Sequence, residues 1–214
     1  LIFARGVANI AITGSGTING QGAHQNFQHG NDSKGGPRRP KIIYFIGCNN
    51  VRVQDVTLRN SAYWTQDYEK CNGVIVRGVK VYSHANWNND GLDIDSRNVV
   101  VSDCYIDCDD DALCLKSDTD TPCENVTVTN CVLKSNCNAI KFGTSSYSGF
   151  KNVTISNCTI DRASEDHIRQ WYKNYPWIGT KHKTVVAGIA LESVDGGIIE
   201  NVSISDIAMQ GVQT

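Results

Sequence analysis

Apolar and polar residues alternate in short segments that recur along the chain. Each segment follows the phrase Asn-Val-x-Val-x-x-(Cys or Val)-x-(hydrophobic), as in NVTVTNCVL and NVTISNCTI. Alternation with a period of two residues predicts a short strand for each segment, and no segment contains a long stretch of helical periodicity. The chain is therefore expected to be built from strands.

The spacing of the segments predicts how these strands are arranged. The first apolar residue of the phrase lies at positions 51, 74, 99, 126 and 153, so the steps are 23, 25, 27 and 27 residues, and Ile10 marks an earlier copy. A repeat of this length with Gly, Asn and Asp at the corners is typical of a parallel β-helix, whereas the Leu spacing of a leucine-rich repeat is missing. We predict an all-β, right-handed parallel β-helix that forms a single domain over residues 1–214.

One interval departs from the repeat. The step from position 153 to the last copy at position 202 is 49 residues, which fits either two coils or one coil with an insertion. Within it, residues 161–183 are rich in aromatic and basic side chains and predict an insertion loop, and such loops on solenoids often form the rim of a binding face. The candidates for substrate contact in this loop are His167, Arg169, Trp171 and Tyr172.

The two ends of the chain look cut. Leu1 begins within a strand-like run, and Thr214 comes just after a strand. A solenoid needs caps, because an open end coil exposes unpaired strand edges. We therefore expect the chain to be a fragment of a longer catalytic domain, truncated at both ends.

A second repeated phrase, a small residue followed by apolar-x-apolar, lies inside the coils. It occurs at residues 91–94, 112–115, 139–142 and 188–191. If these segments stack, neighbouring strands lie about 4.8 Å apart. One column then contains Asp90, Asp111, Asn138 and Ala187, beside a column of Asn89, Asp110 and Cys137. Because inward and outward residues alternate, Leu92, Leu113 and Ile140 are expected in the core, and Asp93, Lys116 and Lys141 are expected to face solvent or a ligand.

Three carboxylates converge in this arrangement. Asp90, Asp110 and Asp111 precede two of the stacked segments, and paired carboxyl groups are the usual acid and base for cleavage of a glycosidic bond. Acidic residues before a strand are also common turn formers, so the hypothesis depends on the stacking. Carboxylates this close cannot all ionise freely, so one should keep its proton near neutral pH, and the sequence does not indicate which one.

Composition narrows the range of functions. The formal net charge is −2, which offers no basic field for nucleic acid or an anionic membrane, and no apolar run is long enough to cross a bilayer. No cysteine pair has the spacing of zinc ligands, so we expect no metal and no cofactor. Six of the nine cysteines fall into two stacks at repeat positions, which favours buried free thiols over disulfides: Cys104, Cys131 and Cys158, and Cys48, Cys71 and Cys123.

The asparagines of the repeat also have a structural interpretation. Sequons such as those at Asn125 and Asn152 recur at the turn position of the coils. A ladder of stacked asparagines accounts for them better than glycosylation does. The composition agrees with a secreted protein, extracellular or periplasmic, and we expect a monomer when the chain is full length.

Several motifs resemble those of the family 28 glycoside hydrolases, the pectin-degrading polygalacturonases, rhamnogalacturonases and their relatives. The resemblance covers nearly the whole chain, from residues 9–22 through Arg39-Pro40 and residues 60–64 to the last strand. The Asn-Thr-Asp-Gly motif of the family matches residues 88–91. Its Asp-Asp pair matches Asp110 and Asp111, and a lysine that often follows matches Lys116. Two such motifs at this separation, inside a predicted β-helix, are a specific signal.

This resemblance implies a pectin-lyase-like solenoid and a hydrolase of α-glycosidic bonds in a pectic or related polysaccharide. It implies that Asp110 protonates the leaving oxygen, that Asp90 and Asp111 orient and deprotonate the attacking water, and that the anomeric carbon is inverted. A short separation between carboxylates is generally linked to retention, so inversion rests on the resemblance alone. The partner is a polysaccharide or oligosaccharide, and the candidate substrate-binding residues are Asn88, Lys116, Asn138, Lys141, Trp87, His84 and Arg169.

Two of the aromatic candidates allow a second interpretation. Trp87 either stacks on a sugar ring or covers a corner of the coil. Trp64, which matches a tryptophan of the family, is expected to be structural.

The departures from the family concern substrate binding. Where the family has Gly-His-Gly, this chain has Cys137-Asn138-Ala139. Where the family has the Arg-Ile-Lys motif that binds a galacturonate carboxylate, the chain has Ala190 and Glu192. A uronate at that position would meet a like charge, which is unfavourable. Unless Lys116, Lys141 or Arg169 replaces the lost cations, a neutral or differently placed sugar is favoured over ordinary polygalacturonate.

Two other functions remain open at this stage. A β-helical polysaccharide lyase would use Lys116 or Lys141 as the base, usually with calcium held by the carboxylates. A catalytically inactive glycan-binding β-helix is the second alternative, because the His, Arg and Lys of the family are absent.

Overall fold

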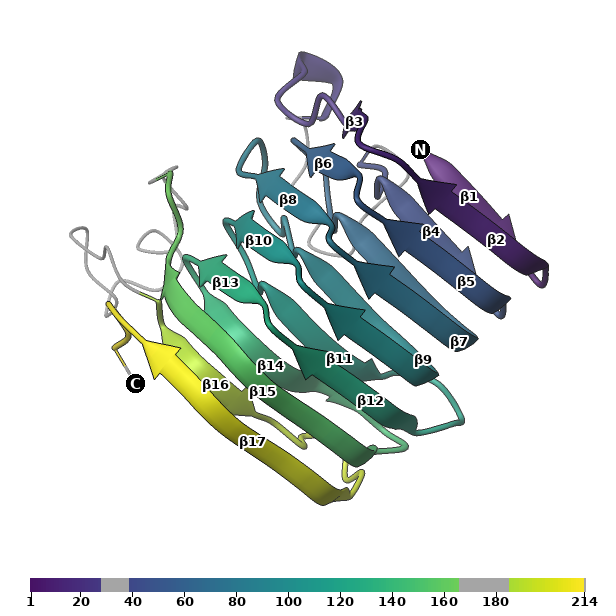
Figure 1. Cartoon of the computed structure of the whole chain (residues 1–214), viewed down its shortest axis with the longest axis vertical. Helices are drawn as coiled ribbons and strands as arrows, with labels where there is room; N and C mark the ends of the chain where they lie inside the picture. The colour runs from purple at the N-terminus through teal and green to yellow at the C-terminus, as the bar shows by residue number, and fades with distance from the viewer. Residues whose placement is uncertain (28–38, 166–184, 214) are drawn as a thin grey trace.

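The computed structural model describes residues 1–27, 39–165 and 185–213. Within them, 17 parallel strands form one continuous sheet that winds into a right-handed parallel β-helix, as predicted (Figure 1). The helical content of these residues is one short 3-10 helix, Gln25–Phe27. The strands are β1 (Ile2–Arg5), β2 (Ala8–Thr13), β3 (Thr17–Asn19), β4 (Ile43–Ile46), β5 (Asn49–Gln54), β6 (Thr57–Arg59), β7 (Gln66–Arg77), β8 (Lys80–Ser83), β9 (Leu92–Ser102), β10 (Tyr105–Cys108), β11 (Leu113–Ser117), β12 (Cys123–Thr129), β13 (Val132–Ser135), β14 (Asn138–Ser146), β15 (Phe150–Arg162), β16 (Ala187–Leu191) and β17 (Ile199–Met209).

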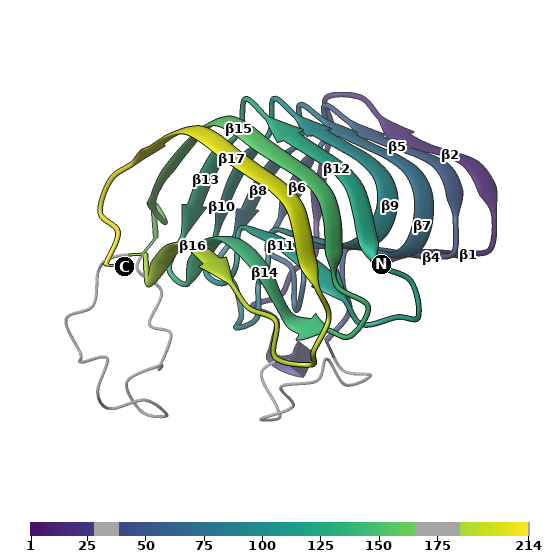
Figure 2. The same ribbon diagram turned by 90° about the horizontal axis from the view of Figure 1, so that it is seen from below.

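The strands stack on three faces of the coil. The first face contains β1, β4, β11, β14, β16 and the first parts of β7 and β9. The second contains β2, β5, β12 and the middle parts of β7, β9, β15 and β17. The third contains β3, β6, β8, β10, β13 and the ends of β15 and β17. Seen from below, β11, β14 and β16 lie opposite β12, β15 and β17 (Figure 2).

The repeat predicted from the sequence is the register of the second face. Ile10 pairs with Val51, and the same column continues through Val74, Val99, Val126 and Val153 to Val202. Because Val153 pairs directly with Val202, the long last step is one coil with an insertion, which decides between the two alternatives.

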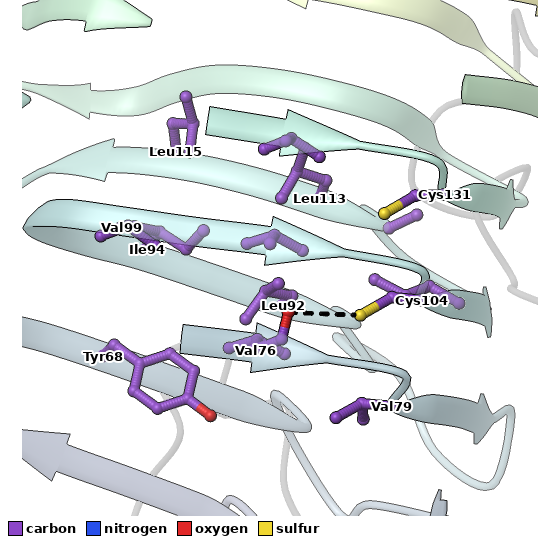
Figure 3. Packing of buried hydrophobic residues seen from close by; sticks show 14 of the residues in the cluster. Tyr68, Val76, Val79, Leu92, Ile94, Val99, Cys104, Leu113, Leu115 and Cys131 are labelled. Atoms are coloured by element: carbon purple, nitrogen blue, oxygen red, sulfur yellow. Dashed lines mark hydrogen bonds between the residues drawn. The ribbon is translucent and has the colours of Figure 1, made fainter. Parts of the chain in front are cut away.

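The core lies between the three faces and is filled by the inward residues of each strand. Leu92, Leu113 and Ile140 are fully buried, as predicted, and they stack in register on the first face. Figure 3 shows Leu92 and Leu113 among the valines of the second face. Each fully buried aliphatic side chain contributes roughly 1.5–3 kcal/mol, so the continuous column is the main source of stability.

All nine cysteines lie among the described residues, and each is free and buried, which confirms the prediction for the two stacks. Cys104, Cys131 and Cys158 occupy one repeat position. The thiol of Cys104 lies 3.7 Å from the carbonyl oxygen of Val76 (Figure 3). These cysteines act as small apolar residues at a corner of the coil.

The asparagine ladder is confirmed at the corner between the first and second faces. Side-chain amides donate to the preceding coil, from Asn152 to Asn125 and from Asn125 to Asn98, both at 3.0 Å. All three residues have a positive φ, for example 55° at Asn125. Asn tolerates this left-handed conformation better than most residues, so the ladder and the turn require the same residue type.

We expect Asn125→Ala to lower the free energy of unfolding by about 2 kcal/mol, since it removes two ladder hydrogen bonds and places alanine in a left-handed turn. Asn125→Gly removes the same hydrogen bonds but accepts the positive φ, so its loss should be smaller. Urea unfolding of both variants measures the difference. An equal loss in the two variants would show that the turn conformation is not responsible.

The predicted boundary of the insertion loop is wrong at its start. Asp161 and Arg162 belong to β15, where they pair with Lys134 and Ser135 of β13. Residues 161 and 162 are polar like the loop that follows, but their backbones pair with β13 of the neighbouring coil. Among the described residues no helix is long and apolar enough to cross a membrane.

Candidate active site

The three candidate carboxylates lie at the corners that lead from the third face into the first. Asp90 precedes β9, and Asp110 and Asp111 lie between β10 and β11 of the next coil. Gly91 makes their approach possible: its amide donates to the carbonyl oxygen of Asp111 at 2.9 Å, and an added Cβ would lie 2.7 Å from the carbonyl oxygen of Ala112. The structure therefore brings the three acids together, as the stacking predicted.

Asp111 is surrounded by groups that stabilise a negative charge. Asn138 donates to Oδ1 from its side chain at 2.7 Å and from its backbone at 3.2 Å. The ammonium of Lys141 lies 3.2 Å from Oδ2. These contacts hold the carboxyl group of Asp111 in a fixed position beside Asp90 and Asp110.

Asp110 has a different environment. Its Oδ1 accepts a hydrogen bond from the backbone amide of Asp111 at 3.0 Å, and its Oδ2 accepts one from the side chain of Asn88 at 3.3 Å. Both contacts orient the carboxyl group. Asn88, a candidate substrate-binding residue, thus contacts one of the candidate catalytic acids directly.

Asp90 is buried among other acidic side chains. It is 3% exposed, and its Oδ1 has no hydrogen-bond partner among the described residues. Burial, followed by repulsion from Asp110, Asp93 and Asp111, raises the pKa of Asp90 well above its usual range. The sequence predicted that one acid of the group would stay protonated, and burial and repulsion favour this state at Asp90.

Lys116 lies close to the candidate carboxylates and to Asp93. Its ammonium is 3.3 Å from Asp93 and 4.4 Å from the ring centre of Trp64. Burial would lower the pKa of Lys116, but nearby Cys114, Asp93, Asp90 and Asp111 raise it well above its usual value. Lys141 behaves in the same way, because Asp111, Cys114 and Glu192 outweigh its burial and raise its pKa. Both lysines are therefore firmly protonated.

The expectation that Asp93 faces solvent or a ligand is wrong. Its side chain points out of the coil, but it is completely buried. Lys116 from the next coil lies against it, and Asp67 is its neighbour on the preceding coil. The sequence pattern gave the direction of the side chain correctly but could not show that neighbouring side chains cover it.

Trp64 is held between charged and aromatic neighbours. The ring of Tyr63 stacks on it at 5.1 Å, and the ammonium groups of Lys41 and Lys116 lie 4.2 and 4.4 Å from its centre. These contacts fit the structural role expected of Trp64.

His84 is buried and forms a hydrogen-bonded pair with Asp107. Its Nε2 lies 3.0 Å from Asp107, which also accepts a hydrogen bond from the backbone of Ser164. Its exposed fraction is 6%. The hypothesis that His84 contacts substrate therefore gains no support from its position.

Arg39 is the residue at this site that the sequence did not assign. It is 4% exposed, and it donates to the carbonyl oxygen of Trp87 at 2.8 Å and to the side chain of Asn88 at 3.2 Å. Its guanidinium also lies 5.3 Å from the ring centre of Trp87. The Arg39-Pro40 pair was a signal of family resemblance, but nothing in the sequence linked it to residues almost 50 positions away.

Where the family has the two cations of its Arg-Ile-Lys motif, this chain has the negative charge of Glu192. Glu192 accepts a hydrogen bond from the hydroxyl of Thr144 at 3.0 Å and lies 3.9 Å from Lys141. Ala190 pairs with Lys141 in the first face. Lys141 thus contacts two carboxylates already, and it does not recreate the free cations of the Arg-Ile-Lys motif. Arg169 and the other candidates of the insertion loop lie outside the described residues.

Two groups of side chains have the donor atoms of a metal site. In each group the donor atoms lie within 4.8 Å of one another: Asp90, Asp111 and Cys114 in the first, and Asp110, Asp111 and Cys137 in the second. Both depend on Asp111, whose carboxylate already has the ammonium of Lys141 at 3.2 Å. A metal ion would face this fixed positive charge, so the site fits a metal poorly, and the absence of a metal stays a prediction.

Comparison with known proteins places this site in a family. Glycosyl hydrolases family 28 matches residues 1–213 of the chain. A probable polygalacturonase of Arabidopsis thaliana is 33% identical over 53% of the chain, and one of Vitis vinifera is 33% identical over 56%. The chain spans about a quarter of the length of these curated relatives, 24% and 25%.

Solved structures agree with the fold. An exopolygalacturonase from Thermotoga maritima aligns with a TM-score of 0.58 and 24% identity, covering 80% of this chain and 38% of its own. A family 28 exopolygalacturonase from Yersinia enterocolitica aligns with a TM-score of 0.51 and 17% identity, covering 81% of this chain and 35% of its own. With the family match over residues 1–213, the chain belongs to glycosyl hydrolases family 28.

Proposed function

We propose that this chain carries the catalytic site of a glycosidase that hydrolyses an α-glycosidic bond in a pectic or related polysaccharide. The observation that carries the proposal is the unequal environment of three adjacent buried carboxyl groups. Asp111 has a cation and an amide against it, whereas Asp90 has repulsive neighbours that raise its pKa. Carboxyl groups in such different environments can take different roles in one reaction.

In the proposed mechanism Asp90 and Asp110 each hold a proton in the resting site, and Asp110 gives its proton to the leaving oxygen, as the family resemblance implies. Asp90 and Asp111 hold the attacking water, and Asp111 takes its proton, as the family resemblance implies; Lys141 and Asn138 hold the carboxyl group of Asp111 in place. Asp90 keeps a proton in the resting site and binds the water through a hydrogen bond. The water then attacks the anomeric carbon as the bond to the leaving oxygen breaks.

Inversion at the anomeric carbon is supported by the family resemblance alone. Ligand oxygens of the proposed acid Asp110 and the proposed base Asp111 lie within 4.8 Å of one another, which is closer than the usual carboxylate separation of roughly 6.5–9.5 Å in inverting enzymes. Proton NMR of the first sugar anomer released decides between inversion and retention.

The raised pKa values of Lys116 and Lys141 disfavour the polysaccharide lyase alternative. A lyase base must lose its proton near neutral pH, and catalytic lysines do so through a lowered pKa. Here the neighbouring carboxylates raise the pKa of both Lys116 and Lys141. Hydrolysis needs no deprotonated lysine, so the charge pattern fits it better.

The first experiment is product analysis on homogalacturonan, rhamnogalacturonan and neutral α-linked oligosaccharides. A hydrolase releases reducing ends without new ultraviolet absorbance, whereas a lyase creates an absorbing unsaturated product. Glycan binding without any turnover would instead identify an inactive binding protein. A polysaccharide substrate also fits the expected extracellular or periplasmic location.

We propose that the sugar beside Glu192 is neutral. The carboxylate of Glu192 and the methyl group of Ala190 replace two cations of the family, so a uronate there would be repelled.

The double substitution Ala190→Arg and Glu192→Lys is expected to raise kcat/KM for a uronate at this position about tenfold relative to a neutral sugar. The pair Ala208→Arg and Glu200→Lys, on strand β17, is the control. An unchanged preference in the first double variant contradicts the proposal.

A further inference from the structure

Arg39 joins three segments that are far apart in the sequence. Its Nη1 donates to the carbonyl oxygen of Trp87 at 2.8 Å, and its Nη2 donates to Oδ1 of Asn88 at 3.2 Å. Its guanidinium lies 4.8 Å from the ring centre of Tyr63 and 5.3 Å from that of Trp87. Arg39 thus packs against two aromatic rings and holds the corner that carries Asn88 and Asp90.

The contact with Arg39 determines which way the amide of Asn88 points. A guanidinium can only donate hydrogen bonds, so the oxygen of the amide must face it. The amide nitrogen then faces the opposite direction, where it donates to Oδ2 of Asp110 at 3.3 Å. Turning the amide over would place its N–H groups against the guanidinium and its oxygen against the carboxyl group of Asp110.

The backbone of Asn88 supports this arrangement. Its φ is 51°, in the left-handed region. The next residue, Asn89, is fully buried, accepts from the backbone of Asn86 at 2.8 Å and donates to the carbonyl oxygen of Ser61 at 2.7 Å. The corner is therefore fixed on both sides of Asn88, and its side chain has little freedom apart from rotation of the amide.

We propose that Arg39 is a positioning residue that acts through Asn88 to orient the carboxyl group of Asp110. This inference rests on the proposed function, in which Asp110 protonates the leaving oxygen. The backbone amide of Asp111 holds Oδ1 of Asp110 at 3.0 Å, and Asn88 holds Oδ2. Two donors on two oxygens fix the plane of the carboxyl group, and proton transfer depends strongly on such alignment.

Direct binding of substrate by Arg39 does not fit its environment. The side chain is 4% exposed, and its two terminal nitrogens donate to Trp87 and Asn88. A uronate carboxylate would have to displace both contacts. Lysine cannot copy the geometry either, because it lacks the planar fork that reaches two acceptors at once.

The test compares Arg39→Met, Arg39→Lys, Asn88→Ala and the double variant of Arg39→Met with Asn88→Ala. Arg59→Met is the matched control, because Arg59 also lies over an aromatic ring, 5.4 Å from the centre of Tyr82, but on the third face. Each protein is assayed on the oligosaccharide that it cleaves best and on the 4-nitrophenyl α-glycoside of the same sugar. Nitrophenolate leaves without needing a proton, so this substrate bypasses the acid.

If Arg39 positions Asp110, kcat on the oligosaccharide falls about ten- to a hundredfold in Arg39→Met and Asn88→Ala, and the double variant falls no further. In Arg39→Met, KM and the rate on the nitrophenyl glycoside stay within about twofold, Arg39→Lys recovers part of the loss, and Arg59→Met is unaffected. Equal losses on both substrates, or additive losses in the double variant, overturn the inference because they indicate general damage to the corner.

Two further measurements separate this inference from the proposed function. If Asp110→Asn keeps full activity, the proposed function fails. If Asp110→Asn is inactive while Arg39→Met is normal, only the role of Arg39 fails. Urea unfolding of the same variants needs no substrate: the double variant should lose less stability than the sum of the losses in Arg39→Met and Asn88→Ala, and fully additive losses would overturn the coupling between Arg39 and Asn88.

Discussion

Asp110→Asn is expected to lower kcat about a thousandfold on any oligosaccharide that the protein hydrolyses. The substitution removes the proton that the leaving oxygen needs, and general acid catalysis contributes roughly 10²–10⁴-fold. Asparagine has the same shape and can still accept the hydrogen bond from the backbone amide of Asp111 at its Oδ1. The fold should therefore survive, and the thermal unfolding temperature should change little.

Asp109→Asn is the control for this experiment. Asp109 lies in the same acidic run and is also buried, but its Oδ1 accepts a hydrogen bond from Asn136 at 2.9 Å. We expect this variant to keep most of its activity. Steady-state kinetics on both variants, with circular dichroism to check folding, gives the answer. Undiminished cleavage by Asp110→Asn would remove Asp110 from the role of general acid.

The second large effect is a loss of stability as the pH rises. Burial, opposed by Lys116 and reinforced by Asp67, raises the pKa of Asp93 to about 7. Burial, reinforced by Glu69 and Asp67, also raises the pKa of Asp95 to about 7, despite a hydrogen bond from the backbone of Asp118. In the unfolded chain an aspartate has a pKa of about 3.9.

The sign of the effect follows from proton binding. Between about pH 4 and pH 7 the folded chain binds these protons and the unfolded chain has lost them, so the free energy of unfolding falls as the pH rises. The stabilisation is complete below about pH 4 and is lost above about pH 7. The shift is about three pKa units and each unit corresponds to about 1.4 kcal/mol, so each of the two groups contributes about 4 kcal/mol.

Urea unfolding at pH 5 and pH 8 measures this difference. Asp95→Asn removes one of the titrating groups, so it should raise stability at pH 8 and reduce the slope between the two pH values. Asp120→Asn is the control, because Asp120 is exposed and its hydrogen bond with Lys70 lowers its pKa. An unchanged slope in Asp95→Asn would show that Asp95 is already ionised at pH 5.

The sequence predicted the stacking well because the pattern that specifies it is local. Each coil repeats the same apolar positions, so the pairing of Val126 with Val153 follows from the alternation itself. The convergence of Asp90 and Asp111 follows in the same way. What the sequence left open was the step from Val153 to Val202, because the length of an insertion does not show whether its residues form another coil.

The parts of the site that were not predicted depend on contacts between corners. Asp93 is buried because Lys116 covers it from the next coil. Arg39 reaches Asn88 across 49 positions of sequence, and His84 is bonded to Asp107 on the next coil. No periodic pattern specifies such contacts, because each depends on the conformation of two turns and not on the repeat.

The division of the site among coils has a consequence for heat inactivation. Asp90, Asp111 and Asn138 come from three successive turns of the solenoid, and each turn contacts only its nearest neighbours. A solenoid can therefore lose order locally while distant turns stay folded. Loss of any one of these three turns would dismantle the catalytic group, so turnover should disappear at a lower temperature than most of the β-sheet signal.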